Sequence, residues 1–420
     1  MKKMLRYLPS LVFCGFIFTF MILFIVLPKA GFSEQEKRNL ASFPEVPKIV
    51  VETEENGEKK TSLNTNFFED VNKFQTTLDT YLSDHTPGRE FFVGLNADYN
   101  LVTGRNGKNG IFLGSDGYLF PEPTFPQPTV IPQEDKKDKT DDKKKSDNTF
   151  NKAENFLKNA GFVKEFADSV DIPVYMTLIP SSGFVNSDKL PLLHKEYNDG
   201  EMIKKYKDTL GNSVIFTDVT DHFVKNSDKQ LYYRTDHHWT SRGAYECYSL
   251  LGKTMGYEPV SEKMFSTETL HDFYGTSYSK GALWFVQPDD IELWRNKTQP
   301  QGSVTVEIKD GADAKQHNDY FFKDQLKNMD KYPVFLDGNH SFVRVTNTSV
   351  PEGKLIVVKD SYAHSIVPFL SQNYREIIMV DLRYYKREIS ALAAEEKADA
   401  VLVLYSIDNM ANDINVSYLF

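Results

Sequence analysis

One short block of the sequence combines a carboxylate with an imidazole. Residues 232–240 read Tyr-Tyr-Arg-Thr-Asp-His-His-Trp-Thr, and Asp236 and His238 stand two positions apart in it. In an extended segment alternate side chains share a face, so Asp236 is expected to orient the ring of His238 while His237 points away. A carboxylate behind an imidazole is the pairing that activates a serine nucleophile. The alternative is an ordinary polar loop.

A second block supplies a serine. Residues 357–362 read Val-Val-Lys-Asp-Ser-Tyr, at the end of an apolar run and before a predicted helix. This places Ser361 at an elbow where the N–H groups of the helix start can bind a developing oxyanion. The alternative for Ser361 alone is a helix N-cap. Together the two blocks provide a serine, a histidine and an aspartate.

Other readings of the first block stay open. Asp-His-His also occurs in metal phosphoesterases, but these need further ligands in defined spacings. Asp218, Asp221 and His222 form no such pattern, so we expect no metal site. Trp239 is expected to be a core aromatic, with a sugar platform as the alternative, and its presence in place of a thiol excludes an Asp-His-His-Cys palmitoyltransferase.

The elements around these blocks alternate between helix and strand. Helices are predicted at about 151–170, 202–210, 241–255, from 362 to 374, and at 385–397, and strands at 172–179, 214–219, 354–358, 376–381 and 400–405. Repeated units of this kind with continuous apolar strands indicate an α/β fold with a mostly parallel, doubly wound sheet. Sites in such sheets form at the carboxyl ends of strands, which is where both blocks are expected. The domain spans 149–420, and residues 257–350 interrupt the alternation as a β-rich insertion.

The preceding segments are simpler. Residues 66–120 are expected to form two helices, at 66–82 and 89–101, and a glycine-rich β-hairpin within 104–120. Residues 121–148 hold five prolines followed by clusters of Asp and Lys. This composition predicts a disordered linker.

The first 28 residues predict a membrane anchor. Lys2, Lys3 and Arg6 precede an uncharged run of 21 residues, 7–27, which is long enough to cross ~30 Å of hydrocarbon as a helix. The flanking cations place the N-terminus in the cytoplasm, so a stalk at 29–65 and everything after it are expected outside the cell membrane. The alternatives are a cleaved signal peptide or a buried core helix.

Composition excludes several classes. The chain has 420 residues, 40% of them hydrophobic, a net charge of −10 and a pI of about 5.5, so wholesale disorder and a basic nucleic-acid surface are both excluded. Its two cysteines, Cys14 and Cys247, supply neither a disulfide framework nor a zinc site.

The block 234–240 resembles the signature of the bacterial DHHW protein family, which is named for those four letters. The resemblance extends to residues 32–36, 273–277, 335–340, 359–362 and 380–385. The family is similar in turn to the SGNH-hydrolase-like domains of alginate O-acetylation proteins, which carry Asp-x-His-Trp and, much later, Gly-Asp-Ser. In this chain Lys359 stands at the position of that glycine, and the motif order is permuted relative to ordinary SGNH hydrolases. The resemblance implies an oxyanion hole with a glycine and an asparagine, for which Gly275 and Asn339 are the candidates and turn residues the alternative.

The resemblance implies a membrane-anchored, extracytoplasmic acyl-ester transferase or esterase that needs no cofactor. Ser361 would attack, His238 would relay the proton and Asp236 would hold the ring. The implied partners are a surface or secreted polysaccharide, with O-acetylation as the expected modification, and a membrane acyltransferase that delivers the acyl group. The alternative is a catalytically inactive glycan-binding or scaffold protein of the cell envelope.

Overall fold

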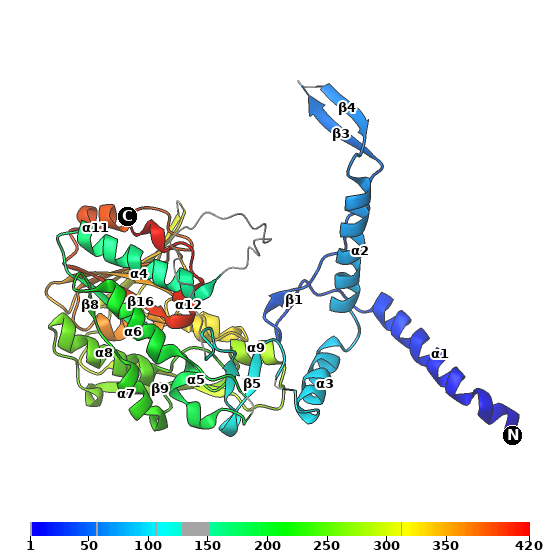
Figure 1. Cartoon of the computed structure of the whole chain (residues 1–420), viewed down its shortest axis with the longest axis horizontal. Coiled ribbons are helices and arrows are strands. Elements are labelled where there is room, and N and C mark those ends of the chain that lie inside the picture. Colours follow the sequence, from blue (N-terminus) through cyan, green and yellow to red (C-terminus); the bar gives the residue numbers. More distant parts are fainter. Residues whose placement is uncertain (1, 56–57, 106, 128–150, 193, 312) are drawn as a thin grey trace, which may run out of the picture. The chain divides into compact units, whose positions relative to one another are not determined.

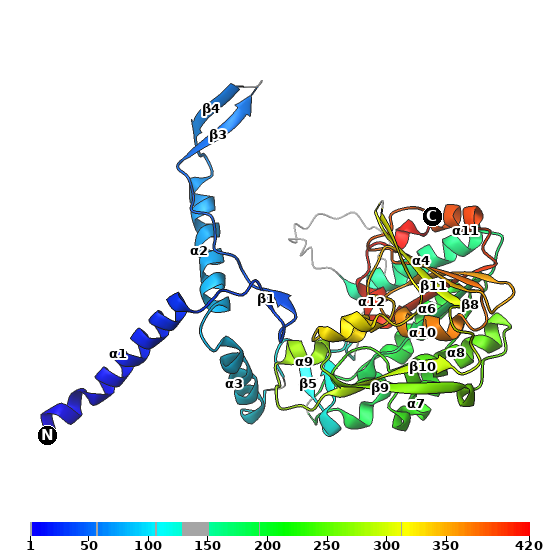
Figure 2. The ribbon, with the colours of Figure 1, turned by 180° about the vertical axis from the view of Figure 1, so that it is seen from behind.

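The computed structural model of the chain describes residues 2–55, 58–105, 107–127, 151–192, 194–311 and 313–420. Its backbone groups into two compact units. The first comprises the chain up to Gly104 together with Ala282–Trp284, and the second comprises Arg105–Gly281 and Phe285–Phe420. Figures 1 and 2 show the ribbon from opposite sides.

The first unit begins with a long apolar helix, α1 (Lys2–Val26). Its segment Tyr7–Val26 has 20 residues with a mean hydropathy of 2.5, and none of them is buried. About 20 apolar residues are needed to span a bilayer. Within the described ranges, α1 is the one helix long and apolar enough to do so.

Two antiparallel strand pairs follow α1 in the segment predicted as a stalk. They are β1 (Phe32–Ser33) with β2 (Arg38–Asn39), and β3 (Val50–Glu55) with β4 (Glu58–Leu63). Helices α2 (Phe67–Asp84) and α3 (Arg89–Val102) complete this unit. The buried carboxylate of Asp84 accepts hydrogen bonds of 3.0 and 2.5 Å from the Arg38 guanidinium, which ties the end of α2 to β2.

The second unit is built on an eight-stranded sheet with the order β12-β11-β13-β15-β14-β16-β7-β8. Five neighbouring strands, β15 through β8 in that order, run parallel, whereas β13, β11 and β12 extend the sheet with antiparallel pairs. The prediction of a mostly parallel sheet is therefore corrected to a mixed sheet. Its strands are β7 (Val174–Ile179), β8 (Ile215–Phe216), β11 (Val304–Asp310), β12 (Asp313–His317), β13 (Phe342–Asn347), β14 (Lys354–Lys359), β15 (Glu376–Val380) and β16 (Ala400–Ser406).

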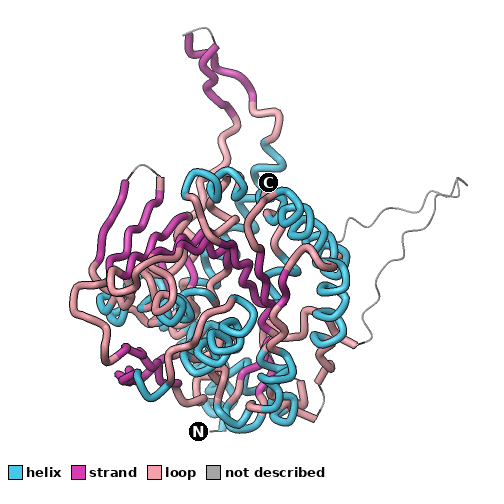
Figure 3. The backbone as a smooth tube through the Cα atoms, turned by 90° about the vertical axis from the view of Figure 1, so that its left-hand side faces the viewer, coloured by secondary structure: helices cyan, strands magenta, loops and turns pink. Residues whose placement is uncertain are grey.

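Helices cover both faces of the sheet, as the tube in Figure 3 shows. Alternate residues of β14 explain this arrangement, because Leu355 and Val357 join one hydrophobic core while Ile356 and Val358 join the other. The first core packs against α8 (Ser241–Met255) and α10 (Ala363–Leu370), and the second against α4 (Lys152–Ser169), α6 (Asp199–Leu210), α11 (Ile389–Glu396) and α12 (Ile407–Asn412). Strands buried on both faces read as continuous apolar runs, which is why the alternation of helix and strand was visible in the sequence.

Helix ends in this unit follow ordinary capping chemistry. The Asn151 side chain accepts from the backbone N–H groups of Ala153 and Glu154 at the start of α4. Thr240 caps α8 through the N–H of Gly243, and Gly256, with φ of 78°, ends that helix in the left-handed conformation. These caps satisfy backbone groups that the first and last helical turns leave unpaired.

The region predicted as a β-rich insertion, 257–350, is β-rich but is not set apart from the sheet. Its strands β9 (Phe265–Phe273) and β10 (Asp289–Asn296) form a separate antiparallel pair. Its strands β11, β12 and β13 instead join the main sheet. The short helix α9 (Thr276–Gly281) lies in the same region.

The glycine-rich hairpin consists of β5 (Ile111–Leu113) and β6 (Leu119–Pro121). The predicted linker begins too early at 121, because Phe125 is 1% exposed and its ring lies 5.0 Å from that of Phe156. Its backbone carbonyl accepts from the N–H of Asn198. The remainder of the linker prediction, residues 128–148, lies outside the described residues.

Candidate active site

The serine elbow follows β14 directly. Strand β14 ends at Lys359, and Asp360, Ser361 and Tyr362 form the turn into α10. Asp360 is buried, and its Oδ1 accepts from the N–H of Tyr362 at 2.9 Å. Its Oδ2 accepts from the N–H and Oγ of Ser406, both at 2.8 Å, at the end of β16. Asp360 therefore fixes the turn and fastens β14 to β16 rather than taking part in the hydrogen-bonded series of Ser361.

The structure brings Ser361, His238 and Asp236 into one hydrogen-bonded series. The Ser361 Oγ lies 2.7 Å from Nε2 of His238, and Nδ1 of the same ring lies 2.5 Å from Oδ1 of Asp236. His238 and Asp236 are buried, whereas Ser361 is partly exposed. A serine reachable from solvent and backed by a buried imidazole and carboxylate is the geometry of an activated hydroxyl nucleophile.

The carboxylate of Asp236 is fully engaged. Its Oδ2 accepts from the N–H and hydroxyl of Thr276, at 2.6 and 3.0 Å, and its Oδ1 accepts from the backbone N–H of His238 at 2.9 Å. Hydrogen bonds of this kind favour the ionised carboxylate. Asp236 thus has one fixed orientation, and that orientation sets the orientation of the imidazole.

Gly275 has a packing role that differs from the predicted oxyanion role. A Cβ on Gly275 would lie 2.2 Å from Cβ and 2.5 Å from Oδ2 of Asp236. Its N–H donates to Oγ1 of Thr235 at 3.1 Å, so this amide is not free to bind an oxyanion. Only a residue without a side chain allows Asp236 to approach Thr276 so closely.

A second buried carboxylate supports the loop from behind. Asp289 accepts from the N–H and hydroxyl of Thr235, both at 2.7 Å, and from the N–H and Nε of Arg234, both at 3.1 Å. These contacts hold the loop that carries Asp236 and His238 against β10. Sequence reasoning missed Asp289 because it lies in the region without clear periodicity.

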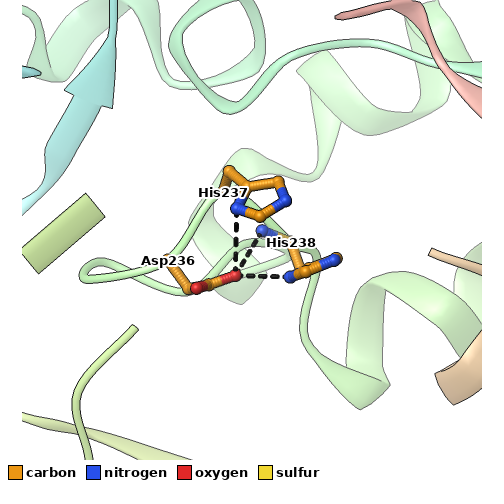
Figure 4. Close-up of side chains that lie close together, drawn as sticks. All are labelled: Asp236, His237 and His238. Atoms are coloured by element: carbon orange, nitrogen blue, oxygen red, sulfur yellow. Dashed lines mark hydrogen bonds and ion pairs between the residues drawn. The ribbon is translucent and has the colours of Figure 1, made fainter. Parts of the chain in front are cut away.

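His237 does not point away from the series. Its Nδ1 lies 2.6 Å from Oγ1 of Thr276 and 3.5 Å from Oδ1 of Asp236. Figure 4 shows the rings of His237 and His238 both facing the same carboxylate oxygen of Asp236, and the ring centroids are 3.9 Å apart. The prediction from period-2 alternation is wrong here because residues 234–238 form a series of bends rather than a strand.

Tyr332 is a site residue that the sequence did not reveal. Its ring stacks on the His238 ring, with centroids 3.9 Å apart and an interplanar angle of 10°. Its hydroxyl donates to the backbone carbonyl of Ser361 at 3.2 Å. Burial raises the pKa of the Tyr332 hydroxyl well above its usual range, so it stays a proton donor at neutral pH. The chain has 22 tyrosines, and nothing in the sequence around Tyr332 distinguishes it as a site residue.

Trp239 is a core residue, and the alternative of a sugar platform is excluded because its side chain is fully buried. Its Nε1 donates to the carbonyl of Tyr362 at 3.1 Å and to Oγ of Ser365 at 2.8 Å. Trp239 thereby joins the histidine block to the first turn of α10.

Asn339 is exposed, and its Oδ1 accepts from the Arg383 guanidinium at 3.3 Å.

Lys359 points into a buried polar cluster behind the elbow. Its Nζ lies 2.9 Å from Nε2 of His364 and 3.3 Å from Oδ2 of Asp381. Burial lowers the pKa of the Lys359 ammonium and holds that of His364 well below its usual range. Burial alone would raise the pKa of Asp381, but hydrogen bonds from Arg383 and the charge of Lys359 outweigh it and lower that pKa. The lysine that replaces the motif glycine is therefore sequestered from the serine hydroxyl.

Asp236, His237 and His238 each have one atom that could coordinate a metal ion. These three atoms lie within 4.8 Å of one another. These atoms are already engaged, however: Asp236 with His238, and His237 with Thr276. His222, the nearest further candidate in the sequence, pairs with Glu246 at 2.7 Å. The hydrogen bonds of Asp236 and His238 are those of a triad with Ser361.

The chain is similar to known proteins in sequence pattern and in fold. The family model for the DHHW protein matches residues 198–380, which include all three members of the series. A DHHW family protein from Eubacterium siraeum is 19% identical, with a TM-score of 0.58 over 74% of this chain and 95% of its own. Bacillus cereus PatB1, solved with a sulfonyl adduct, is 21% identical, with a TM-score of 0.54 over 63% of this chain and 90% of its own.

A more distant similarity is found to the O-acetyltransferase domain of Pseudomonas putida AlgJ, at 13% identity and a TM-score of 0.43 over 72% of this chain and 93% of its own. None of the curated proteins compared with the chain matches it. The chain shares its fold with the DHHW protein from E. siraeum and with PatB1, and over residues 198–380 it resembles the DHHW family.

Proposed function

We propose that the protein is a serine-dependent acyl-ester transferase or esterase. The observation that carries the proposal is the hydrogen-bonded series from Ser361 through His238 to Asp236. Within it, the imidazole can take the hydroxyl proton as the serine attacks, and Asp236 stabilises the resulting imidazolium.

The reaction follows in two balanced steps. The Ser361 Oγ attacks the acyl carbonyl, and its proton moves to Nε2 of His238. The tetrahedral intermediate expels the alcohol oxygen, which takes that proton, and leaves an acyl-serine. Water or a sugar hydroxyl then attacks, His238 takes its proton, and Ser361 leaves and recovers it. The acceptor decides between hydrolysis and transfer.

Two groups remain candidates for binding the oxyanion. The backbone N–H of Ser361 makes no hydrogen bond within the described residues, and it lies at the turn into α10. Asn339 uses Oδ1 to accept from Arg383, which leaves its amide nitrogen as a donor in the part of the chain that the structure describes. Such donors act most strongly when they are fixed before the charge develops.

The finer proposal concerns the substrate and the location. We place the ester on a cell-surface or secreted polysaccharide, with acetyl as the acyl group, because the sequence blocks resemble those of alginate O-acetylation proteins. Helix α1 supports an anchored, extracytoplasmic enzyme, and a membrane acyltransferase would supply the acyl group. The AlgJ domain is described as an O-acetyltransferase, which names the activity to assay first.

The test uses the full chain in detergent micelles with 4-nitrophenyl acetate and with phenylmethylsulfonyl fluoride. PatB1 was solved with a sulfonyl adduct, which makes this reagent a natural probe of the fold. We expect ester turnover and a single sulfonyl mass addition, both abolished by Ser361→Ala. Ser227→Ala, at a partly exposed serine outside the site, should retain both.

The alternative is a glycan-binding protein that has lost activity, and Lys359 in the glycine position is the feature that favours it. Because its ammonium contacts His364 and Asp381, this lysine leaves the serine unobstructed. Absence of both turnover and labelling in the wild-type chain would support the alternative instead.

A further inference from the structure

The chain reaches a topological switch point beside Ser361. After β14, helix α10 packs into the hydrophobic core that also holds Leu355 and Val357. After the neighbouring strand β16, helix α12 packs into the core on the other face, with Ile356 and Val358. In open α/β sheets, ligands bind outside the carboxyl ends of strands at such a point. The topology alone therefore marks the β14–β16 boundary as a place for a ligand.

A cavity of about 140 Å³ is present at this boundary. Its lining comes from the segments that follow three adjacent strands: Asp360 after β14, Arg383 after β15, and Asn409, Asn412 and Asn415 after β16. We call it the asparagine pocket. Asp360 lines the pocket and directly precedes Ser361 in the chain, so the pocket borders the turn that carries the proposed nucleophile.

We infer that the asparagine pocket binds a neutral sugar ring of the acceptor. This inference rests on the proposed function and names the acceptor class for the same site. A hydroxyl of a sugar held there would attack the carbonyl of acyl-Ser361. His238 would take the hydroxyl proton, and the serine oxygen would leave and recover it.

The free polar atoms of the pocket match sugar hydroxyls, which both donate and accept. Arg383 uses Nε and Nη2 on Asp381, so Nη1 remains as a donor among the described residues. Asn409 donates to Asp360, and Asn412 donates to the carbonyl of Asp408. Each leaves its amide oxygen as an acceptor.

The charges of the pocket favour a neutral ligand over an acidic one. The carboxylate of Asp360 accepts from Tyr362, Ser406 and Asn409. Asp413 accepts from Asn415 at 2.8 Å and from the Tyr405 hydroxyl at 3.2 Å. The Arg383 charge is balanced by Asp381. With Arg383 balanced, Asp360 and Asp413 leave the lining negative, so a sugar carboxylate or phosphate would be repelled and would gain no cation that is not already paired.

The experiment measures binding without turnover. The full chain carrying Ser361→Ala, in detergent micelles, is titrated with methyl glycosides of glucose, galactose, mannose and N-acetylglucosamine, and with methyl glucuronide and glycerol phosphate, by saturation-transfer NMR. Ile414→Trp is added to fill the pocket, because Ile414 lines it and is 69% exposed. Leu192→Trp, at a fully exposed residue outside the pocket lining, is the matched control.

We expect at least one neutral glycoside to bind. Ile414→Trp should raise its dissociation constant by about tenfold or more, equivalent to about 1.4 kcal/mol, whereas Leu192→Trp should leave the dissociation constant unchanged. Asn412→Ala should weaken binding of the same glycoside as well, because it removes one polar group of the pocket lining. No binding of any neutral glycoside, binding indifferent to Ile414→Trp, or a preference for the acidic ligands would overturn the inference. If the wild-type chain shows no ester hydrolysis, the proposed function is wrong. The binding experiment does not depend on turnover, so the two failures can be distinguished.

Discussion

At the scale of residues, the site depends on a small number of hydrogen bonds that act in series. His238 contacts Ser361 through Nε2 and Asp236 through Nδ1, so removal of any one of the three residues interrupts the series. We expect Ser361→Ala and His238→Ala each to lower ester turnover by about 10³-fold or more, and the double variant to lose little further. His237→Ala should cost much less, because Nδ1 of His237 contacts Thr276, whereas it is Nε2 of His238 that contacts the serine hydroxyl. Steady-state turnover of the four proteins measures this, and additive losses would contradict a concerted unit.

Gly275 provides a residue-scale test of how closely Asp236 must be held. A methyl group at this position would lie 2.2 Å from the Asp236 side chain, so Gly275→Ala must displace the carboxylate. Because small misplacements of catalytic groups are costly, turnover should fall by about 10²-fold. Gly161→Ala is the control: apart from the neighbouring backbone of α4, no atom lies within 4 Å of its Cβ position, and the exchange should stabilise that helix by about 1 kcal/mol. Equal turnover in the two variants would show that activity does not depend on the close contact between Gly275 and Asp236.

At the scale of elements, the elbow after β14 depends on Asp360 more than on the helix that follows. This buried carboxylate holds Tyr362 and Ser406 together, so Asp360→Ala leaves several buried donors without acceptors. The free energy of unfolding should fall by about 1–3 kcal/mol, measured by urea denaturation. Asp324→Ala, at a side chain that is 94% exposed, should leave the midpoint unchanged. An unchanged midpoint for Asp360→Ala would show that backbone contacts alone hold the elbow.

The elements also show where sequence reasoning succeeds and where it stops. The segments around β7, β14, β15 and β16 were visible because strands buried on both faces form unbroken apolar runs. The position of β11 to β13 at the sheet edge was not predictable from the sequence. It depends on the antiparallel pairing of β13 with β15, a long-range contact that local composition does not indicate. In the same way Ser361 and His238 stood in recognisable blocks, whereas Asp289 and Tyr332 reach the site only through the folding of residues 257–350.

At the scale of the whole molecule, the buried cluster behind the elbow predicts sensitivity to acid. Burial, the first cause, and then the charge of Lys359 lower the pKa of His364 well below 6.5 in the folded chain. The unfolded chain therefore binds more protons at this residue below pH 6.5, so stability is full above that pH and falls as the pH drops toward the folded pKa. The slope from one group is at most about 1.4 kcal/mol per pH unit.

Urea denaturation across pH 4.5 to 7.5, a range chosen to bracket about 6.5, the ordinary histidine pKa, tests this linkage. His364→Asn should flatten the dependence of stability on pH in the acid part of that range. His271→Asn, at a side chain that is 72% exposed, should not. Parallel curves for the wild-type and His364→Asn chains would show that another group dominates the acid response.

The last prediction concerns where the second unit lies. Helix α1 is apolar along Tyr7–Val26, and none of these residues is buried, an arrangement that is costly in water and favourable in a bilayer. Lys2, Lys3 and Arg6 precede this segment, whereas Lys29 is the nearest cation after it, and the side with more cations remains in the cytoplasm. A reporter enzyme that is active only outside the cytoplasm should therefore be active when it is fused after Phe420. Replacing Lys2, Lys3 and Arg6 by glutamine should reduce that activity by weakening the charge asymmetry. Activity of a reporter that functions only in the cytosol would place the serine on the other side of the membrane and remove surface polysaccharide as its substrate.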